Sequence, residues 1–586
     1  MTETPEARRT ARAAWLRALA LTEPIGRIPA RTFPAVIEAL GEKWGDAPAI
    51  LSDDACWSFR DLTGQVNRVA RWADGQSIGA GDVVALFMPN CPDYLALWLG
   101  ITRVSGVVAL VNANLRGDAL TRAIAMVGAR HVIVGASLAD ALAAAALSPG
   151  TKSWTYGAGA DKFPRIDDAI AALSADAPMR GKAPSIADPA LYIYTSGTTG
   201  RSKAAHVSHE RIMHWSHWFA GMMDTGPADR MYDCLPMYHG IGGIVAVGAA
   251  LVGGGSVAIR PGFSARAFWD DVVRFDCTLF QYIGELCRYL VASPPHPKER
   301  RHRIRLCCGS GLGADVWEKF QARFAIPRIL EFYAATEGVV SLYNCEGRPG
   351  AIGRVPPYLA HRAAVALVKL GADGEPLRAA DGSCVGCAAD EVGEALGRIG
   401  TDGARFEGYS AGQDSERKVL RDVFAKGDAW FRTGDLMRRD GAGYFRFVDR
   451  IGDTFRWKGE NVSTAEVAAA IRSCLGVADA AVYGVTIPGA DGRAGMAAIV
   501  PGAGFDPAAL WQAIAARLPA YARPLFVRLR PALETTATLR PVKEALARDG
   551  FDPAHIADPL YFNDGTGFVP LDADLFGRIV AGEMRL

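Results

Sequence analysis

The sequence LYIYTSGTTGRSK, residues 191–203, places a short apolar stretch directly before a loop of hydroxyl groups and glycines that ends in a lysine. Such a pattern is typical of a buried strand that stops at a turn. Glycines let the backbone approach an anion, hydroxyls add hydrogen-bond donors, and a lysine adds a positive charge. The stretch therefore predicts a phosphate-binding loop, with an ordinary polar loop as the alternative. It lacks the G-x-x-x-x-G-K-[ST] spacing of a Walker A loop.

Further apolar runs surround this stretch. Residues 83–88, 107–111 and 131–134 each predict a short strand, and residues 92–100 predict a helix between the first two. Strands that alternate with helices indicate an α/β fold with mainly parallel sheets. Residues 371–400 are rich in Gly, Asp and Ala, which favours a β-rich lobe with exposed loops.

The last part of the chain predicts a small α+β domain. Residues 463–466 read Ser-Thr-Ala-Glu, which fits a capping box at the start of a helix. Apolar residues then recur at helical spacing. Two strands, a second helix and a third strand are expected after it, and their ranges are 480–485, 496–500, 508–518 and 525–529.

Composition limits the class of protein. The chain has 586 residues, too many for one core, and 64 Lys+Arg against 63 Asp+Glu, so neither nucleic-acid binding nor an acidic tail is indicated. The 11 cysteines are scattered, and Arg17 interrupts the one early apolar stretch, so a cytoplasmic chain with free thiols and no signal peptide is expected. Cys384 and Cys387 form a CxxC pair without a second pair, which favours two loop thiols over a zinc site.

Two segments raise the question of a membrane. Residues 240–259 are uncharged and long enough to span a bilayer, but three consecutive glycines at 253–255 favour a helix, a turn and a buried strand. Near the N-terminus, Arg12 and Arg17 lie beside Trp15 and Leu16. This stretch fits either peripheral association with an anionic surface such as the plasma membrane or a solvated surface helix. The oligomeric state stays open, a homodimer included.

The predicted phosphate loop, 195–203, resembles that of the adenylate-forming superfamily, which includes acyl-CoA synthetases, peptide-synthetase adenylation domains and luciferases. Other segments resemble that superfamily in the same order: 237–240, 333–337, 433–435 and 449–453. The longer strings 282–290 and 452–464 are similar to the fatty acid transport protein branch, which also contains the very-long-chain acyl-CoA synthetases.

This resemblance implies a large N-terminal AMP-binding domain, residues 1–451, with mainly parallel sheets and the β-rich lobe. A small mobile α+β lid, residues 452–586, would follow and rotate about Gly452. The implied reaction joins ATP and a long-chain or very-long-chain fatty acid into an acyl-AMP, which CoA then converts to acyl-CoA. ATP, CoA and Mg²⁺ are the implied cofactors and co-substrates.

The resemblance also implies roles for single residues. The β- and γ-phosphates would be held by Thr195, Ser196, Gly197, Thr198, Thr199, Gly200 and Lys203. Tyr333 would face adenine, Thr336 would contact the α-phosphate and Glu337 would bind Mg²⁺. Asp435 would accept the ribose hydroxyls, with Arg450 nearby. Backbone at Gly309, Ser310 and Gly311 would pass close to the nucleotide.

The remaining implied roles concern the fatty acid and CoA. The acyl pocket would be lined by Tyr238, His239, Tyr282 and Gly284, with His239 shaping the pocket and not acting as a base. Trp457 and Lys458 would lie on the CoA side.

Two positions depart from the family pattern. Ala334 stands where a glycine is usual, and Arg540 aligns with the lysine that the C-terminal domain normally brings to the adenylation site. Arginine has a wider, planar head, so this exchange is not conservative. Lys543, one helical turn later, is the alternative catalytic cation.

Three other functions stay open at this point. The protein could serve mainly fatty acid uptake at a membrane, it could bind acyl-nucleotides without turnover, or it could pass the acyl group to a carrier-protein thiol instead of CoA.

Overall fold

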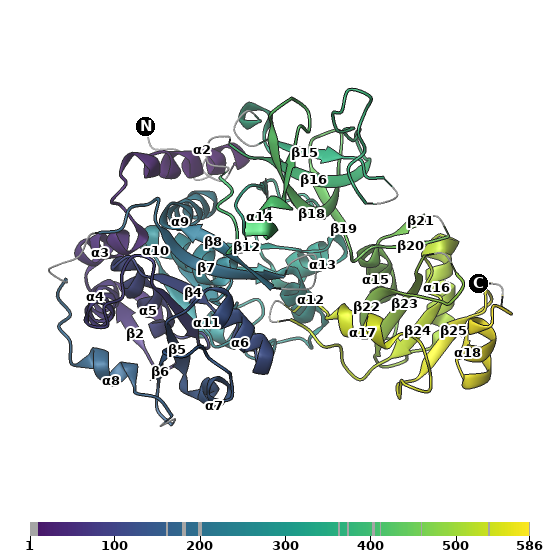
Figure 1. The fold of residues 1–586 in the computed structure, drawn as a ribbon, viewed down its shortest axis with the longest axis horizontal. Helices are drawn as coiled ribbons and strands as arrows, with labels where there is room; N and C mark the ends of the chain where they lie inside the picture. Colours follow the sequence, from purple (N-terminus) through teal and green to yellow (C-terminus); the bar gives the residue numbers. More distant parts are fainter. Residues whose placement is uncertain are drawn as a thin grey trace. The chain divides into compact units, whose positions relative to one another are not determined.

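The computed structural model describes residues 10–159, 162–177, 183–196, 202–360, 364–371, 374–400, 405–410, 412–458, 460–490, 492–536, 539–584 and 586. The chain forms two compact units (Figure 1). Unit 1 comprises residues 1–365 and 397–431, and unit 2 comprises 366–396 and 432–586. Part of the β-rich lobe therefore belongs to the same compact unit as the C-terminal residues. The expected boundary and hinge at Gly452 stay a prediction.

One six-stranded sheet of unit 1 carries the predicted phosphate loop. Its spatial order is β6 (Lys152–Tyr156), β5 (His131–Gly135), β3 (Val83–Phe87), β4 (Val107–Leu110), β7 (Pro189–Ser196) and β8 (Ser202–Ser208). The first five strands run parallel, while β7 and β8 form an antiparallel hairpin. The predicted strands near residues 83, 107 and 131 are confirmed. Strands β3, β4 and β5 are buried throughout, as expected of continuous apolar runs in a parallel sheet.

A second sheet of unit 1 has eight strands. Its spatial order is β14 (Ser341–Asn344), β13 (Ile329–Ala334), β12 (Leu306–Ser310), β11 (Leu279–Ile283), β9 (Arg230–Asp233), β10 (Ser256–Ile259), β1 (Pro48–Leu51) and β2 (Cys56–Ser58). Only the two outermost pairs are antiparallel. The expected α/β class with mainly parallel sheets is therefore confirmed.

Helices alternate with these strands along the chain (Figure 1). They are α2 (Ala11–Thr22), α3 (Phe33–Trp44), α4 (Phe59–Gly75), α5 (Pro92–Arg103), α6 (Gly117–Met126), α7 (Ala139–Ala143), α8 (Ile166–Ala171), α9 (His209–Met223), α10 (Val247–Val252), α11 (Phe268–Arg274), α12 (Gly284–Ala292), α13 (Ala314–Phe324) and α14 (Gly412–Glu416). Short 3-10 turns lie at Ile25–Arg27, Ala136–Leu138 and Pro357–Leu359.

The uncharged segment 240–259 divides as the sequence predicts. A π-helix, η3 (Ile241–Ala246), leads into α10, a turn follows at residues 253–255, and β10 is a buried strand. Among the described residues, no helix is both long and apolar enough to cross a bilayer.

Helix α2 packs on α9 and does not present its whole basic face outward. The Trp15 ring meets the rings of Trp218 and Tyr343 edge-on at 5.6 and 5.4 Å. The Arg17 guanidinium donates to the Gly221 carbonyl at 3.0 Å. Any membrane contact of this helix would therefore depend on its exposed Arg12 and Leu16, since Trp15 and Arg17 are engaged within the protein.

Unit 2 includes strands of the β-rich lobe. The strands of the lobe are β15 (Val365–Val368), β16 (Val392–Arg398), β17 (Val419–Arg421), β18 (Ala429–Arg439) and β19 (Phe445–Arg450). Isolated bridges pair Val368 with Gly386 and Arg378 with Cys384, so residues 374–400 have the short strands and turns that were expected. All eleven cysteines are free.

The C-terminal residues form the predicted α+β arrangement. Its elements are β20 (Phe455–Trp457), β21 (Glu460–Val462), α15 (Thr464–Arg472), β22 (Val477–Val485), β23 (Ala494–Pro501), α16 (Pro507–Arg517), η5 (Ala520–Ala522), β24 (Phe526–Leu529), α17 (Lys543–Asp549), β25 (Leu560–Asn563), β26 (Phe568–Pro570) and α18 (Ala573–Val580). The Ser463 side chain accepts the Glu466 N–H, so the Ser463 half of the expected capping box is confirmed. Strands β22 to β26 form one sheet in sequence order.

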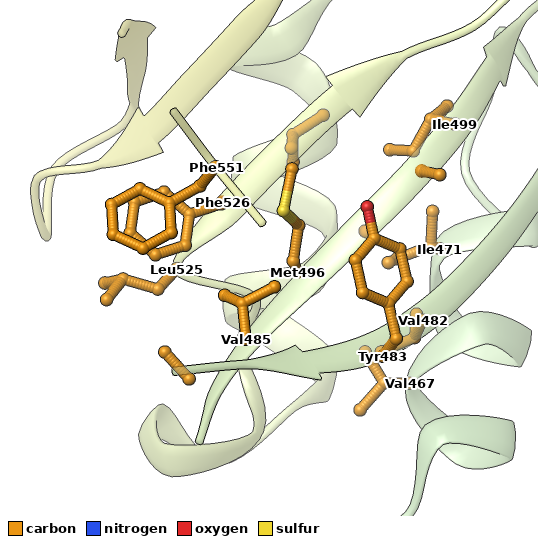
Figure 2. Packing of buried hydrophobic residues seen from close by; sticks show 14 of the residues in the cluster. Val467, Ile471, Val482, Tyr483, Val485, Met496, Ile499, Leu525, Phe526 and Phe551 are labelled. Carbon is orange, nitrogen blue, oxygen red and sulfur yellow. The ribbon is translucent and has the colours of Figure 1, made fainter. Parts of the chain in front are cut away.

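The core of this sheet contains an aromatic stack (Figure 2). The Phe526 and Phe551 rings lie parallel within 18°, with centroids 4.2 Å apart, next to Met496 and Val485. Phe526 is completely buried. Removing its ring would leave a cavity that the surrounding strands close only partly.

We expect Phe526→Ala to lower the free energy of unfolding of this unit by about 3–5 kcal/mol, because burial and ring packing are lost together. Hydrogen exchange of the β23 and β24 amides in the intact chain measures this locally. Leu475→Ala is the matched control: Leu475 is 90% exposed, so its loss should change stability by no more than about 0.5 kcal/mol. Equal exchange rates in the two variants would contradict the assignment of Phe526 to the core.

Candidate functional site

The predicted phosphate loop lies at the end of the β7–β8 hairpin. Thr195 pairs with Lys203 across the two strands, so the hairpin brings the start and the end of the loop together. Gly197, Thr198, Thr199 and Gly200 lie outside the described residues, as does the side chain of Ser196. Lys203 is buried, and its ammonium lies 5.4 Å from the centre of the Tyr409 ring. A cation over an aromatic face in a dry setting is a favourable contact.

Tyr409 also contacts the predicted metal ligand. Its hydroxyl donates to a carboxylate oxygen of Glu337. Residues 408–410 run beside β8, where the Gly408 carbonyl accepts from the His206 N–H and the Ser410 N–H donates to the Ala204 carbonyl. One tyrosine therefore links Lys203, predicted to hold the β- and γ-phosphates, with Glu337, predicted to bind Mg²⁺. Tyr409 was not predicted, because its contacts join segments that lie far apart in the chain.

A buried arginine holds the same region from behind. The Arg211 guanidinium donates to the carbonyls of Arg405 and His206 at 2.6 and 3.1 Å and lies 3.3 Å from the Glu407 carboxylate. It also reaches the Thr336 carbonyl at 3.5 Å. Glu407 in turn accepts from the Ser208 N–H and hydroxyl, both at 2.7 Å. The predicted phosphate contact Thr336 is thus tied to the start of α9.

Arg211 and Glu407 were missed by sequence reasoning. The available signal was a charged residue within a stretch of α9 whose neighbours are mostly apolar, and that signal is weak. Gly338 adds a second constraint, because it has a φ of +76° and a Cβ there would lie 2.8 Å from the Arg211 side chain.

The carboxyl ends of β11, β12 and β13 bring Tyr282 and Gly284, which were predicted at the acyl pocket, next to the residues predicted near the nucleotide. Gly309 pairs with Tyr282 on one side, and Tyr333 lies near the end of β13. A Cβ at Gly309 would lie 2.2 Å from the Tyr282 carbonyl oxygen, and one at Gly284 would lie 1.7 Å from that of Gly311. The sequence explained the glycine at 309 by close approach of a nucleotide. Contacts within the protein give a further reason for this glycine, since they already exclude a side chain there, and the approach of the nucleotide stays a prediction.

The segment predicted at the acyl pocket precedes the π-helix η3. Tyr238 is buried, and its ring centre lies 4.7 Å from that of His239. Burial raises the pKa of the Tyr238 hydroxyl well above its ordinary value. The His239 carbonyl accepts the Gly243 N–H at 2.8 Å, so His239 is bonded to the start of this helical segment. π-Helical turns are frequent at functional sites, so this geometry agrees with a pocket wall.

Unit 2 contains the residues predicted near ribose. Asp435 and Arg450 lie opposite each other on the antiparallel strands β18 and β19, and the Arg450 Nε donates to Asp435 at 3.1 Å. Asp435 is 4% exposed. The neighbouring Asp449 accepts from the N–H and hydroxyl of Thr464, at 2.6 and 3.0 Å, and therefore caps α15.

The residues just after the predicted hinge differ in exposure. Gly452 has a φ of +101°, a conformation that favours glycine. Trp457 is buried in the core of unit 2, while Lys458 is exposed and has a φ of +51°. The CoA-side role of Trp457 and Lys458 stays a prediction, and direct contact would involve Lys458 more readily than the buried indole.

The two candidate C-terminal cations have different surroundings. The Lys543 ammonium donates to the Thr464 hydroxyl at 2.7 Å and lies 4.0 Å from the Asp453 carboxylate. Arg540 is exposed and ends a tight turn in which the Thr536 N–H donates to its carbonyl at 2.7 Å. Within unit 2, the Lys543 ammonium therefore binds the first residue of α15, whereas Arg540 is the more exposed of the two cations.

Comparison with known proteins identifies the family. The AMP-binding enzyme description matches residues 37–375, and the AMP-binding enzyme C-terminal domain matches residues 466–539. Long-chain fatty acid transport protein 1 of Mus musculus is 40% identical over 574 residues, which cover 95% of this chain and 88% of that protein. Medium/long-chain-fatty-acid–CoA ligase FadD6 of Mycobacterium tuberculosis is 37% identical over 545 residues, 92% of this chain and 89% of that one.

Solved structures show the same fold. ATP-bound MatB from Rhodopseudomonas palustris superimposes with a TM-score of 0.74 at 24% identity and covers 89% of this chain and 99% of its own. The anthranilate CoA ligase AuaEII gives a TM-score of 0.75 at 19% identity, over 88% of this chain and 97% of its own. The chain thus belongs to the AMP-binding enzymes of the adenylate-forming superfamily, in the fatty acid transport protein branch.

Proposed function

We propose that the protein is an AMP-forming fatty acid–CoA ligase for long-chain or very-long-chain acids. The observation that carries this proposal is the contact of Tyr409 with both Lys203 and Glu337. Tyr409 holds the buried Lys203 ammonium and the Glu337 carboxylate near each other, an arrangement that suits a polyphosphate with its bound cation. A polar loop without a ligand would need neither charged group. The family and the names of the relatives support the acid–thiol ligation.

The reaction has two balanced steps. A fatty carboxylate oxygen attacks the α-phosphorus of ATP, an acyl-AMP forms and pyrophosphate leaves. The CoA thiolate then attacks the acyl carbon, the thioester forms and AMP leaves. Negative charge builds on the phosphoryl oxygens in the first step, so Lys203 and the N–H groups of the loop would stabilise that transition state.

Mg²⁺ fits the chemistry of Glu337. Its carboxylate supplies the hard oxygen that this cation prefers, and Mg²⁺ is commonly bound by one or two carboxylates together with substrate phosphates. When bound, the ion would neutralise phosphate charge. The Tyr409 hydroxyl would orient the carboxylate, and Arg211 would fix the backbone at the neighbouring Thr336.

Fatty acid uptake is a second candidate, favoured by the name of the mouse relative. Ligation itself would retain the acid in the cell, because CoA esters do not cross a bilayer readily, so uptake would follow from the proposed activity in a cytoplasmic or peripherally bound enzyme. A carrier-protein thiol as acceptor has no observation in its favour.

The proposed activity is tested by ATP–pyrophosphate exchange across a series of fatty acids, followed by thioester formation with CoA. We expect exchange to be greatest with long chains, and Lys203→Ala to weaken the use of ATP while the fold stays intact. Absence of exchange with every acid would reject the ligase. Fatty acid uptake that persists in cells expressing an exchange-inactive variant would make transport separate from ligation.

Asp435→Ala should raise the KM for ATP about tenfold or more, because the variant loses an ionised acceptor for the ribose hydroxyls and leaves the Arg450 guanidinium without this partner. Asp574→Ala removes an exposed carboxylate of the same unit and should leave KM unchanged. Equal values of KM in Asp435→Ala and wild type would refute the ribose role. The measurement is exchange at varied ATP and saturating fatty acid.

We also propose that Arg540, and not Lys543, supplies the C-terminal cation for adenylation. Arg540→Ala should slow acyl-AMP formation on the order of 100-fold, as expected for loss of one group that stabilises the transition state, and Arg540→Lys should restore most of the rate. Lys543→Ala should mainly destabilise the start of α15, since its ammonium binds Thr464. Thioester formation from supplied acyl-AMP should change little in all three. The reverse pattern, with only Lys543→Ala inactive, would assign the role to Lys543.

A further inference from the structure

A row of three residues crosses the strands beneath the predicted adenine site. Tyr282 on β11 pairs with Gly309 on β12, and Gly309 pairs with Glu331 on β13. A Cβ at Gly309 would lie 2.5 Å from the Tyr282 ring. Because glycine has no side chain, the Tyr282 ring can lie across β12 at this position. The Tyr282 hydroxyl thereby reaches the Glu331 carboxyl group, at 2.5 Å.

The other oxygen of Glu331 binds the turn that follows β12. It accepts from the Gly311 N–H at 2.5 Å and from the Leu312 N–H at 3.3 Å. Gly311 has a φ of +85°, and its carbonyl lies against Gly284, where a Cβ would meet it at 1.7 Å. The turn is therefore fixed on one side by steric contact and on the other by one carboxyl group.

This carboxyl group lies in an apolar part of the core. Glu331 is 1% exposed, and burial raises its pKa from an ordinary value of 4.5 to about 8. The titratable groups that face it are the Tyr282 hydroxyl from β11, two thiols from β12 and the Cys287 thiol from α12, and burial raises the pKa of each well above its ordinary value. At neutral pH all of them are therefore uncharged.

A neutral acid can make each of these contacts. Its carbonyl oxygen accepts the two N–H groups of the turn, and its hydroxyl oxygen accepts from the Tyr282 hydroxyl. Tyr333 lies two residues further along β13 and so shares a face of the strand with Glu331. The same strand thus supplies both the residue predicted to face adenine and the residue that holds the neighbouring turn.

From this geometry we infer that Glu331 is a positioning residue for the nucleotide, which fixes the turn at residues 309–312 by accepting its N–H groups. The inference rests on the proposed function, since that turn is the one assigned to the nucleotide. Glu331 does not touch the reacting atoms, and its effect reaches ATP through the backbone of the turn.

The test compares Glu331→Leu with Glu331→Gln. Leucine fills the space but leaves two N–H groups without an acceptor, so we expect the Kd for ATP and the KM for ATP to rise about tenfold or more, with a smaller change in kcat. Glutamine offers an oxygen to the same N–H groups and an N–H₂ group to Tyr282, so it should retain ATP binding close to wild type. Direct binding by calorimetry needs no fatty acid substrate.

Asp271→Asn is the matched control. Asp271 is also a buried carboxylate that accepts from a tyrosine hydroxyl, that of Tyr232. It is paired with Arg260 and Arg274 as well, and none of these three partners is assigned to the nucleotide. A rise in the Kd for ATP no larger in Glu331→Leu than in Asp271→Asn would overturn the inference, and so would a Glu331→Gln variant as defective as Glu331→Leu. A wild-type protein that binds ATP but exchanges pyrophosphate with no acid would reject the proposed function alone.

The pH dependence supplies a second readout. The folded protein retains a proton on Glu331 that the unfolded chain releases above pH 4.5. Stability from this group is therefore complete below about pH 4.5 and decreases as the pH rises to about 8. The glutamine cannot titrate, so the unfolding free energy of Glu331→Gln should decrease less steeply than that of wild type between about pH 5 and 8. Parallel slopes would overturn the neutral hydrogen-bonded state.

Discussion

The buried guanidinium of Arg211 is the contact on which the arrangement of the predicted phosphate site depends. It binds carbonyls from three separate segments and pairs with Glu407, which itself caps the start of α9. Removing one partner of a buried ion pair typically costs about 3–5 kcal/mol, because the other charge is left uncompensated. The backbone at Thr336 and the segment that carries Tyr409 are therefore held in place before any substrate binds. Such preorganisation is what stabilisation of phosphoryl charge requires.

The predicted adenine side of unit 1 is stabilised by a buried neutral acid and not by an ion pair. There the buried acid Glu331 has no cation among the titratable groups that face it, and the chain accommodates it by raising its pKa instead of pairing it. The ion pair of Arg211 and Glu407 suits a site that receives phosphates and a cation, since the two charges of the pair already neutralise each other. The neutral acid Glu331 suits a site for an uncharged base, because an ionised carboxylate there would repel the adjacent phosphates. The two halves of the site thus differ in charge as their expected ligands do.

Sequence reasoning predicted the elements and the order of the site, but not the contacts that fix them. Apolar runs predicted the buried parallel strands, and three glycines predicted the turn before β10, because both signals are local in the chain. Arg211, Glu407, Tyr409 and Glu331 were missed, because each has partners that lie far away in the chain. Leu312 lies 19 residues from Glu331, for example, and Ser208 lies 199 residues from Glu407. The glycine at 309 was expected for a nucleotide, yet Tyr282 already fills the space over it. A sequence pattern therefore predicts that a glycine is needed at a position, but it does not identify the neighbouring group that excludes a side chain there.

Strand β19, directly before the predicted hinge, carries two adjacent charged residues with different roles. Neighbouring side chains on β19 point to opposite faces, so Asp449 turns toward α15 and Arg450 turns toward Asp435. The first aspartate serves the fold, because it caps a helix whose Thr464 also binds Lys543. The arginine serves the predicted ribose site, because it orients a carboxylate that is almost inaccessible to water. Asp449 and Arg450, adjacent in the same family pattern, therefore have different roles. A substitution at Asp449 should lower the stability of α15 and leave the acceptor Asp435 in place.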